Sequence, residues 1–180
     1  MAIRKMTDGV SSWNNKMPFP RERYQIRCVL EEFGLSSGDN PMITREFEIL
    51  SPDTVPLGDR TVSVGGRTVM QWRVVKVKDD AAKSDKSFGQ LRDELLMAGY
   101  PHDGEVDDEN PPLYFKDKVF DAILYGKEDV SRRAPTPEQI KKGSKVGDPI
   151  KDANGKEIKT YQIQIDQILG LSTVETNKPY

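Results

Sequence analysis

Several stretches of the chain alternate apolar and polar residues with a period of two, which is the pattern of half-buried strands. Other stretches of similar length are rich in Val, Ile and aromatic residues and are bounded by Gly, Pro, Asn and Asp. The stretch at residues 113–125 is rich in apolar residues on both faces and shows a break near residues 116–118. The pattern predicts five main strands, at residues 23–33, 42–50, 67–77, 113–125 and 158–169.

The third of these strands, RTVMQWRVVKV, has an interrupted phase. Gln71 and Arg73 share one parity, while Lys76 falls on the other. A β-bulge at Val74–Val75 would account for the change, because one extra residue turns all later side chains over. The bulge favours Trp72 in the core and the three polar residues outside. Without it, Trp72 would share an exposed face with Lys76.

One helix is predicted, at residues 87–98, with the sequence SFGQLRDELLMA. Ser87 and the Gln three residues later form a capping box, and Gly99 supplies a stop. The spacing of the apolar positions predicts a single buried stripe, which consists of Phe88, Leu91, Leu95 and Ala98.

The chain divides into an arm, one domain and a tail. Residues 1–21 are polar and predict a flexible arm, part of which docks through Trp13 and Phe19. Residues 22–171 form the domain, and residues 172–180 form the tail. Within the domain, the loop between the second and third strands holds a short strand at Thr61–Val64. The fourth and fifth strands are joined by a long polar connection, 126–157, with a hairpin turn at Asn154–Gly155.

The order of elements, β-β-β-α-β-β, indicates a mainly β protein. Five short strands with one helix between the third and fourth are typical of a five-stranded OB-fold barrel. An open α+β sandwich accommodates the same elements. In an OB barrel the long connection between the fourth and fifth strands flanks the binding face.

Charge is distributed unevenly along the 180 residues, although the net charge is only −2. Residues 1–78 carry 12 basic and 9 acidic residues, residues 79–131 carry 6 and 14, and residues 132–180 carry 9 and 6. Such asymmetry is a hint of a nucleic-acid partner, and a mixed solvated surface explains it equally well.

Few residues are suited to catalysis or to binding a metal. The chain has one Cys, Cys28, within an apolar strand, and one His, His102. The acidic run HDGEVDDE does not have the spacing of an EF-hand loop, and no phosphate-binding or hydrolase motif is present. We therefore expect no enzyme activity, no cofactor and no metal. The absence of a secretory signal and of a long apolar run predicts a cytoplasmic protein without a membrane partner.

Binding to single-stranded DNA needs basic side chains for phosphates and flat side chains for bases. For each basic residue, a solvated surface charge is the alternative explanation. The candidates for stacking include Trp72 and Tyr125. The basic and polar candidates lie on the first three strands and in the long connection: Arg23, Arg27, Arg45, Arg67, Gln71, Arg73, Lys76, Arg132, Arg133, Lys141 and Lys142.

The layout resembles the small OB-fold single-stranded-DNA-binding proteins encoded by bacteriophages. The features that carry the resemblance are RYQIRCVLEEF, the turn into MITREFEIL, the helix SFGQLRDELLMAGY and the last strand ending IDQILGL. The resemblance implies a protein of DNA replication or recombination in the host cytoplasm that coats single strands. Its implied partners are single-stranded DNA, replication or recombination proteins and further copies of the chain.

The tail ETNKPY departs from the acidic, apolar-tipped tail of the cellular bacterial proteins of this class. Recruitment of partners through such a tail is therefore in doubt. A protein-interaction or structural module on a β-barrel scaffold is the alternative function, and a nuclease is a more distant one.

Overall fold

The computed structural model describes residues 10–132, 141 and 147–173. It is mainly β with one helix, as the alternating pattern predicts. In chain order the elements are β1 (Val10–Ser12), β2 (Glu22–Leu35), β3 (Pro41–Ser51), β4 (Thr54–Leu57), β5 (Arg60–Ser63), β6 (Thr68–Val74), α1 (Ala81–Met97), β7 (Val119–Val130) and β8 (Lys159–Leu171).

The strands form two sheets. The larger is antiparallel and has the order β6-β3-β2-β7-β8, so the five main strands expected from the sequence all belong to it. The smaller has the order β1-β5-β4, with β1 parallel to β5. Within the described residues, β6 and β8 approach each other without hydrogen-bonded pairing, so the larger sheet is not a closed barrel.

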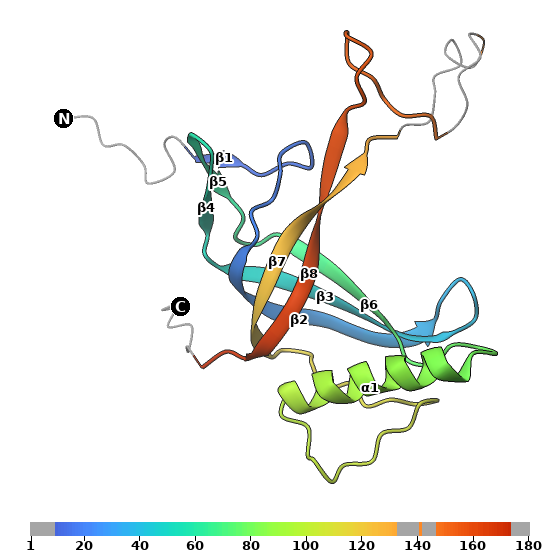
Figure 1. Cartoon of the computed structure of the whole chain (residues 1–180). Helices are drawn as coiled ribbons and strands as arrows, with labels where there is room; N and C mark the ends of the chain where they lie inside the picture. The colour runs from blue at the N-terminus through green and yellow to red at the C-terminus, as the bar shows by residue number, and fades with distance from the viewer. Residues whose placement is uncertain (1–9, 133–140, 142–146, 174–180) are drawn as a thin grey trace.

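The long strand β2 joins two halves of the larger sheet. Its residues 22–27 pair with β7 and its residues 25–35 pair with β3, and its register against β3 shifts at Gln25/Ile26 and at Cys28/Leu30. Such bulges bend a strand and increase its twist. Figure 1 shows the result: β7 and β8 cross in front of β2, β3 and β6 and continue beyond them as a two-stranded arm, while α1 lies beneath.

The second bulge in β2 exchanges the two faces of that strand. Tyr24, Ile26 and Cys28 are buried, as their parity predicts. Beyond the bulge the faces exchange, so that Leu30 is half-exposed and Glu31 is buried. The sequence does carry a sign of this change, because the apolar Phe33 has the parity of Glu31 and not that of Leu30.

The main core gathers residues from both sheets and from the segment before β2. Trp13 and Phe19 are buried and meet edge to face, so residues 10–20 pack on the domain. Phe19 passes directly over Gly126 of β7, where a Cβ atom would lie 2.7 Å from the Phe19 nitrogen. The close approach explains why the strand carries glycine there.

The helix is longer than its apolar stripe. Leu91, Leu95 and Ala98 are buried as predicted. The predicted cap at Ser87 is wrong, because α1 begins six residues earlier, where the carboxylate of Asp80 accepts a hydrogen bond of 3.0 Å from the N–H of Lys83. At the other end Gly99 has φ +82°, a conformation that ends a helix.

The fourth main strand begins at Val119 and not at residue 113. Asp117 has φ +65°, which interrupts an extended ladder, close to the break that the sequence predicts at 116–118. The short strand predicted at Thr61–Val64 is present as β5 and pairs with β4.

A second, smaller cluster lies between the larger sheet and α1, and a buried arginine adjoins it. Arg45 is 0% exposed. Its Nε donates to Glu31 at 2.9 Å, and its Nη1 donates to Glu94 at 2.7 Å and to the amide oxygen of Gln71 at 2.9 Å. The guanidinium also lies 3.7 Å from the ring centroid of Phe115. Arg45 therefore joins β2, β3, β6, α1 and the segment before β7.

This arrangement explains why an arginine stands on the apolar parity of β3. The position is neither a strand end nor a shifted register, since Arg45 pairs regularly with both neighbouring strands. Its charge is neutralised inside the protein, and the second oxygen of Glu31 accepts a hydrogen bond of 2.7 Å from the N–H of Phe115. The prediction that Arg45 contacts nucleic acid is therefore wrong.

Replacement of Arg45 by Met tests the weight of this network. The change leaves the carboxylates of Glu31 and Glu94 buried without their main partner, and we expect a loss of about 3–5 kcal/mol in the free energy of unfolding. Urea denaturation followed by circular dichroism measures the loss. Arg27→Met, which removes an exposed pair with Glu48, is the matched control and should change stability by less than about 1 kcal/mol. Equal losses in the two variants would contradict the assignment.

Candidate nucleic-acid interface

Trp72 lies on the outer face of the larger sheet. The pairing of β6 with β3 runs without a break from Thr68 opposite Glu48 to Val74 opposite Met42. Val69 and Val75 are buried, whereas Trp72 is 57% exposed, as strict alternation requires. The predicted bulge at Val74–Val75 and the predicted core position of Trp72 are therefore both wrong.

Apolar and polar side chains surround Trp72 on this outer face. Thr44 lies directly opposite it on β3, Met70 and Val74 lie two residues away along β6, and Met42 lies on the diagonal. All four are half-buried. We call these five residues the Trp72 face. Glu46, on the other diagonal, is also half-buried. The helix packs on the opposite side of the sheet, so the indole has an open side.

Gln71 and Arg73 point the other way, toward α1, and the prediction that they face outward is wrong. Nε of Arg73 donates to Glu94 at 3.1 Å, and its Nη1 donates to Gln90 at 2.9 Å. The side-chain amide of Gln71 donates to Glu94 at 3.3 Å. With the end of β8 these residues line an open cleft of about 270 Å³ between β6, α1 and β8. Because Glu94 holds Arg73, this cation is not free to meet a phosphate.

Two cations stand toward opposite ends of the Trp72 face. Arg27 on β2 pairs with Glu48 on β3, and Glu48 pairs in turn with Thr68 on β6. Thr68 lies four residues before Trp72. Lys76 comes four residues after Trp72 and continues its parity. Each is paired with an exposed carboxylate: Arg27 lies 2.7 Å from Glu48, and Lys76 lies 3.1 Å from Asp108. The hydrogen bond to Asp108 and its negative charge raise the pKa of Lys76.

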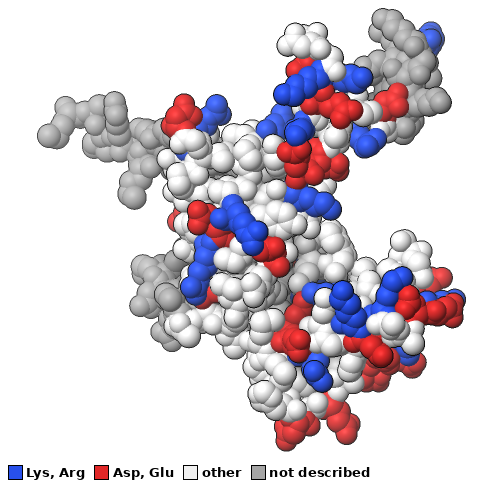
Figure 2. All heavy atoms as spheres, in the orientation of Figure 1, with Lys and Arg blue, Asp and Glu red and all other residues white. Residues whose placement is uncertain are grey.

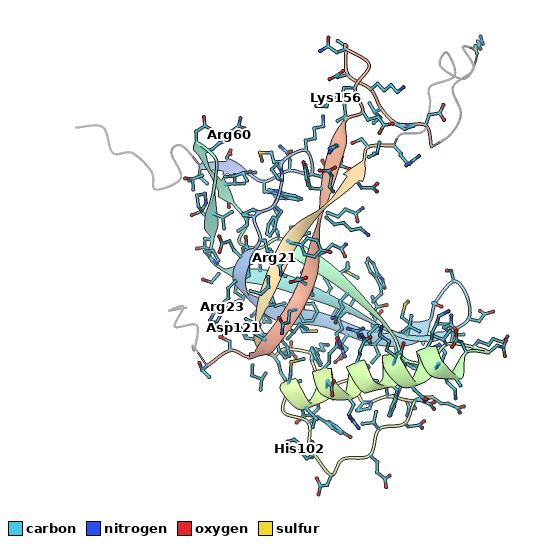
Figure 3. The ribbon with its side chains drawn as sticks, in the orientation of Figure 1. Arg21, Arg23, Arg60, His102, Asp121 and Lys156 are labelled. Atoms are coloured by element: carbon cyan, nitrogen blue, oxygen red, sulfur yellow. The ribbon has the colours of Figure 1, made fainter. Side chains whose placement is uncertain are left out.

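The remaining candidates are dispersed. Arg23 is paired with Asp121 at 2.6 Å, and the two lie side by side in Figure 3. Arg67 is exposed at the turn before β6, and Tyr125 is half-buried on β7 opposite Gln164.

In the connection between β7 and β8, the guanidinium of Arg132 donates to the carbonyl of Gly147 at 2.6 Å, and Lys141 is exposed. Arg133 and Lys142 lie outside the described residues. On the side of the molecule that Figure 2 shows, basic and acidic side chains are interleaved and form no continuous basic band. The interface that the structure brings together is therefore the Trp72 face with Arg27 and Lys76.

The one thiol and the one imidazole lie in different surroundings. Cys28 is buried in the main core, whereas His102 lies on the exposed loop beneath α1 (Figure 3). Burial, followed in effect by the negative charge of Glu31, raises the pKa of Cys28 to about 12. In the described part of the chain, no group of three or more His, Cys, Asp and Glu is placed to hold a metal ion. No described helix is long and apolar enough to cross a membrane.

Comparison with protein-family models, curated proteins and solved structures found no match to this chain.

The two tryptophans provide a test of the outward orientation. In Trp72→Phe the remaining Trp13 is 9% exposed, so its emission should be blue-shifted and weakly quenched by acrylamide. In Trp13→Phe the remaining Trp72 should emit at longer wavelength and be quenched strongly. Steady-state fluorescence with acrylamide titration measures both. The reverse order of quenching would show that Trp72 is the buried one.

Cys28 provides a test of the core around β2. The thiolate is the reactive form of cysteine, and a pKa near 12 keeps it scarce at neutral pH. We expect a chromogenic disulfide reagent to label the folded protein very slowly between pH 7 and pH 9, and to label it at once in denaturant. Fast labelling of the folded protein at pH 8 would place the thiol at the surface.

Proposed function

We propose that this protein binds single-stranded DNA and coats it during phage replication or recombination. The observation that carries the proposal is the 57% exposed Trp72 on an open face of the sheet, beside the half-buried apolar side chains of Met42, Met70 and Val74. An aromatic platform of this kind stacks on a nucleobase without regard to sequence. Bases in a duplex are stacked on each other, so the platform favours single strands.

The strand order supports an OB-fold as the scaffold of this function. The first main strand, β2, is central and pairs with the second and the fourth, β3 and β7. The third and fifth, β6 and β8, are the two edges and approach each other. OB barrels are partly open, and their second and third strands bind oligonucleotides. The Trp72 face lies on those two strands, β3 and β6.

The connection between β7 and β8 supports the same function. In OB-folds this loop borders the bound strand. Here β7 and β8 extend it as the two-stranded arm that rises from the larger sheet on the side away from α1 in Figure 1, with Lys156 near its tip in Figure 3. Lys127 and Lys151 in this connection are exposed and can follow a phosphate backbone, whereas the exposed Lys159 is paired with Glu128.

Phosphate binding at the sheet itself falls to Arg27 and Lys76. Both are engaged with surface carboxylates, and exposed ion pairs of this type contribute little to stability. A phosphate can therefore replace the carboxylate at a small free-energy cost. Binding through these cations should release counterions and weaken as salt rises.

A protein-interaction module remains the second candidate, and one observation favours it. Exposed tryptophans in apolar surroundings are also typical of the centres of protein interfaces. Size-exclusion chromatography with light scattering separates the two functions. An assembly of defined size that is lost in Trp72→Ala would favour the interaction module. An assembly that persists in that variant and does not respond to DNA would show that Trp72 serves neither DNA stacking nor protein contact.

A titration with oligo-dT at low salt tests the proposal. Wild-type protein should bind saturably, with quenching of tryptophan emission, and the affinity should fall steadily as salt is raised. Trp72→Ala should weaken binding roughly 5- to 150-fold, which corresponds to about 1–3 kcal/mol for one stacked base. Trp72→Phe should retain part of the affinity. Fluorescence anisotropy of a labelled oligonucleotide measures all three.

Leu113→Ala is the control for this titration, because Leu113 is 46% exposed and lies outside the Trp72 face. It should leave the affinity unchanged. Wild-type protein that fails to bind at low salt would remove the proposal. Equal binding by Trp72→Ala and wild type would remove the role of the Trp72 face.

A further inference from the structure

The loop that follows α1 is acidic and is held in place at two points. Residues 101–110 carry five carboxylates, at Asp103, Glu105, Asp107, Asp108 and Glu109. Val106 packs against the smaller core cluster, and Pro111 is buried. Asp107 accepts a hydrogen bond of 2.9 Å from the N–H of Glu109. The three acids at 107–109 are therefore presented on a fixed turn between two anchors.

This turn meets the cation at one end of the Trp72 face. Nζ of Lys76 lies 3.1 Å from Asp108 and 3.6 Å from Glu109. The side chains of Lys76 and Asp108 are 41% and 40% exposed, and that of Glu109 is 78% exposed. The contact is open to solvent, so an incoming anion can reach the cation without any rearrangement of the core.

We propose that the acidic turn 107–109 is an autoinhibitory contact that competes with DNA phosphates for Lys76. The inference rests on the proposed function and adds a form of regulation to the same face. Carboxylates hold the cation when no strand is bound, and a phosphate displaces them when a base stacks on Trp72. Four residues of extended chain separate Lys76 from Trp72, which is about 13 Å, within the reach of a short single strand.

The exchange has a consequence for the salt dependence of binding. A phosphate that meets a free cation releases condensed counterions, with a slope of about 0.7 per contact for single strands. A phosphate that displaces Asp108 and Glu109 leaves two carboxylates to gather cations from solution. In the wild-type protein, Lys76 should therefore add little to the slope of log K against log salt, although a free cation at this position would add about 0.7.

The experiment is an oligo-dT titration over a range of salt concentrations. Asp108→Asn/Glu109→Gln should bind about two- to fivefold more tightly than wild type at low salt, the range of one surface ion pair. The slope of log K against log salt should steepen by about 0.7. In a Lys76→Ala background the same double change should produce neither effect, because the cation for which the turn competes is gone.

The control is Asp103→Asn/Glu105→Gln, which removes the same charge from the same loop at positions away from Lys76. This control should change the affinity for oligo-dT and the salt slope less than Asp108→Asn/Glu109→Gln does. Its effect should be the same in the wild-type and the Lys76→Ala backgrounds. An equal gain from both double variants, or a gain that persists without Lys76, would overturn the inference in favour of general electrostatics. Wild-type binding that depends on Trp72, with no gain from Asp108→Asn/Glu109→Gln, would overturn the inference alone. Absence of any wild-type binding would overturn the proposed function and the inference with it.

Discussion

The buried charge of Arg45 is the constraint on which the rest of this structure depends. A guanidinium taken out of water is tolerated only when its partners are fixed around it. Here they come from three elements: Glu31 on β2, Gln71 on β6 and Glu94 on α1. These contacts fix the height of the helix against the sheet and the register of β6 against β3. Apolar packing alone, which has no direction, specifies such relations less sharply.

The orientation of Trp72 follows from this network. Gln71 must face inward to reach Arg45, and Arg73 must face inward to reach Glu94. Because side chains alternate along a strand, the residue between them has to face outward. The exposed indole is thus a consequence of buried polar contacts on the other side of the same strand. A rule that assigns polar residues to solvent reverses the faces of Gln71, Trp72 and Arg73.

The sequence predicts what depends on local periodicity and misses what depends on distant partners. The alternation of β3, the alternation of β2 as far as Cys28 and the apolar stripe of α1 are visible because each buries one continuous face. The bulge after Cys28 and the partner of Arg45, 49 residues away in Glu94, are not local properties. A sign was nevertheless present. Arg45 stands on the apolar parity of a strand, and Glu94 stands beside the apolar stripe of the helix. Two opposite charges on two faces that must meet predict a buried pair.

The network also separates the cations that can meet DNA from those that cannot. Arg45 and Arg73 are held by Glu94, which is itself buried, and their release would leave a carboxylate without a partner in the interior. Arg27 and Lys76 are held by carboxylates that water already reaches, so exchange with a phosphate returns those carboxylates to solvent. A count of basic residues on β3 and β6 therefore overstates the charge available to a ligand. What remains is an aromatic platform with one exchangeable cation toward each end. In the proposed function, such a surface would depend on stacking for its affinity and on ion exchange for its control.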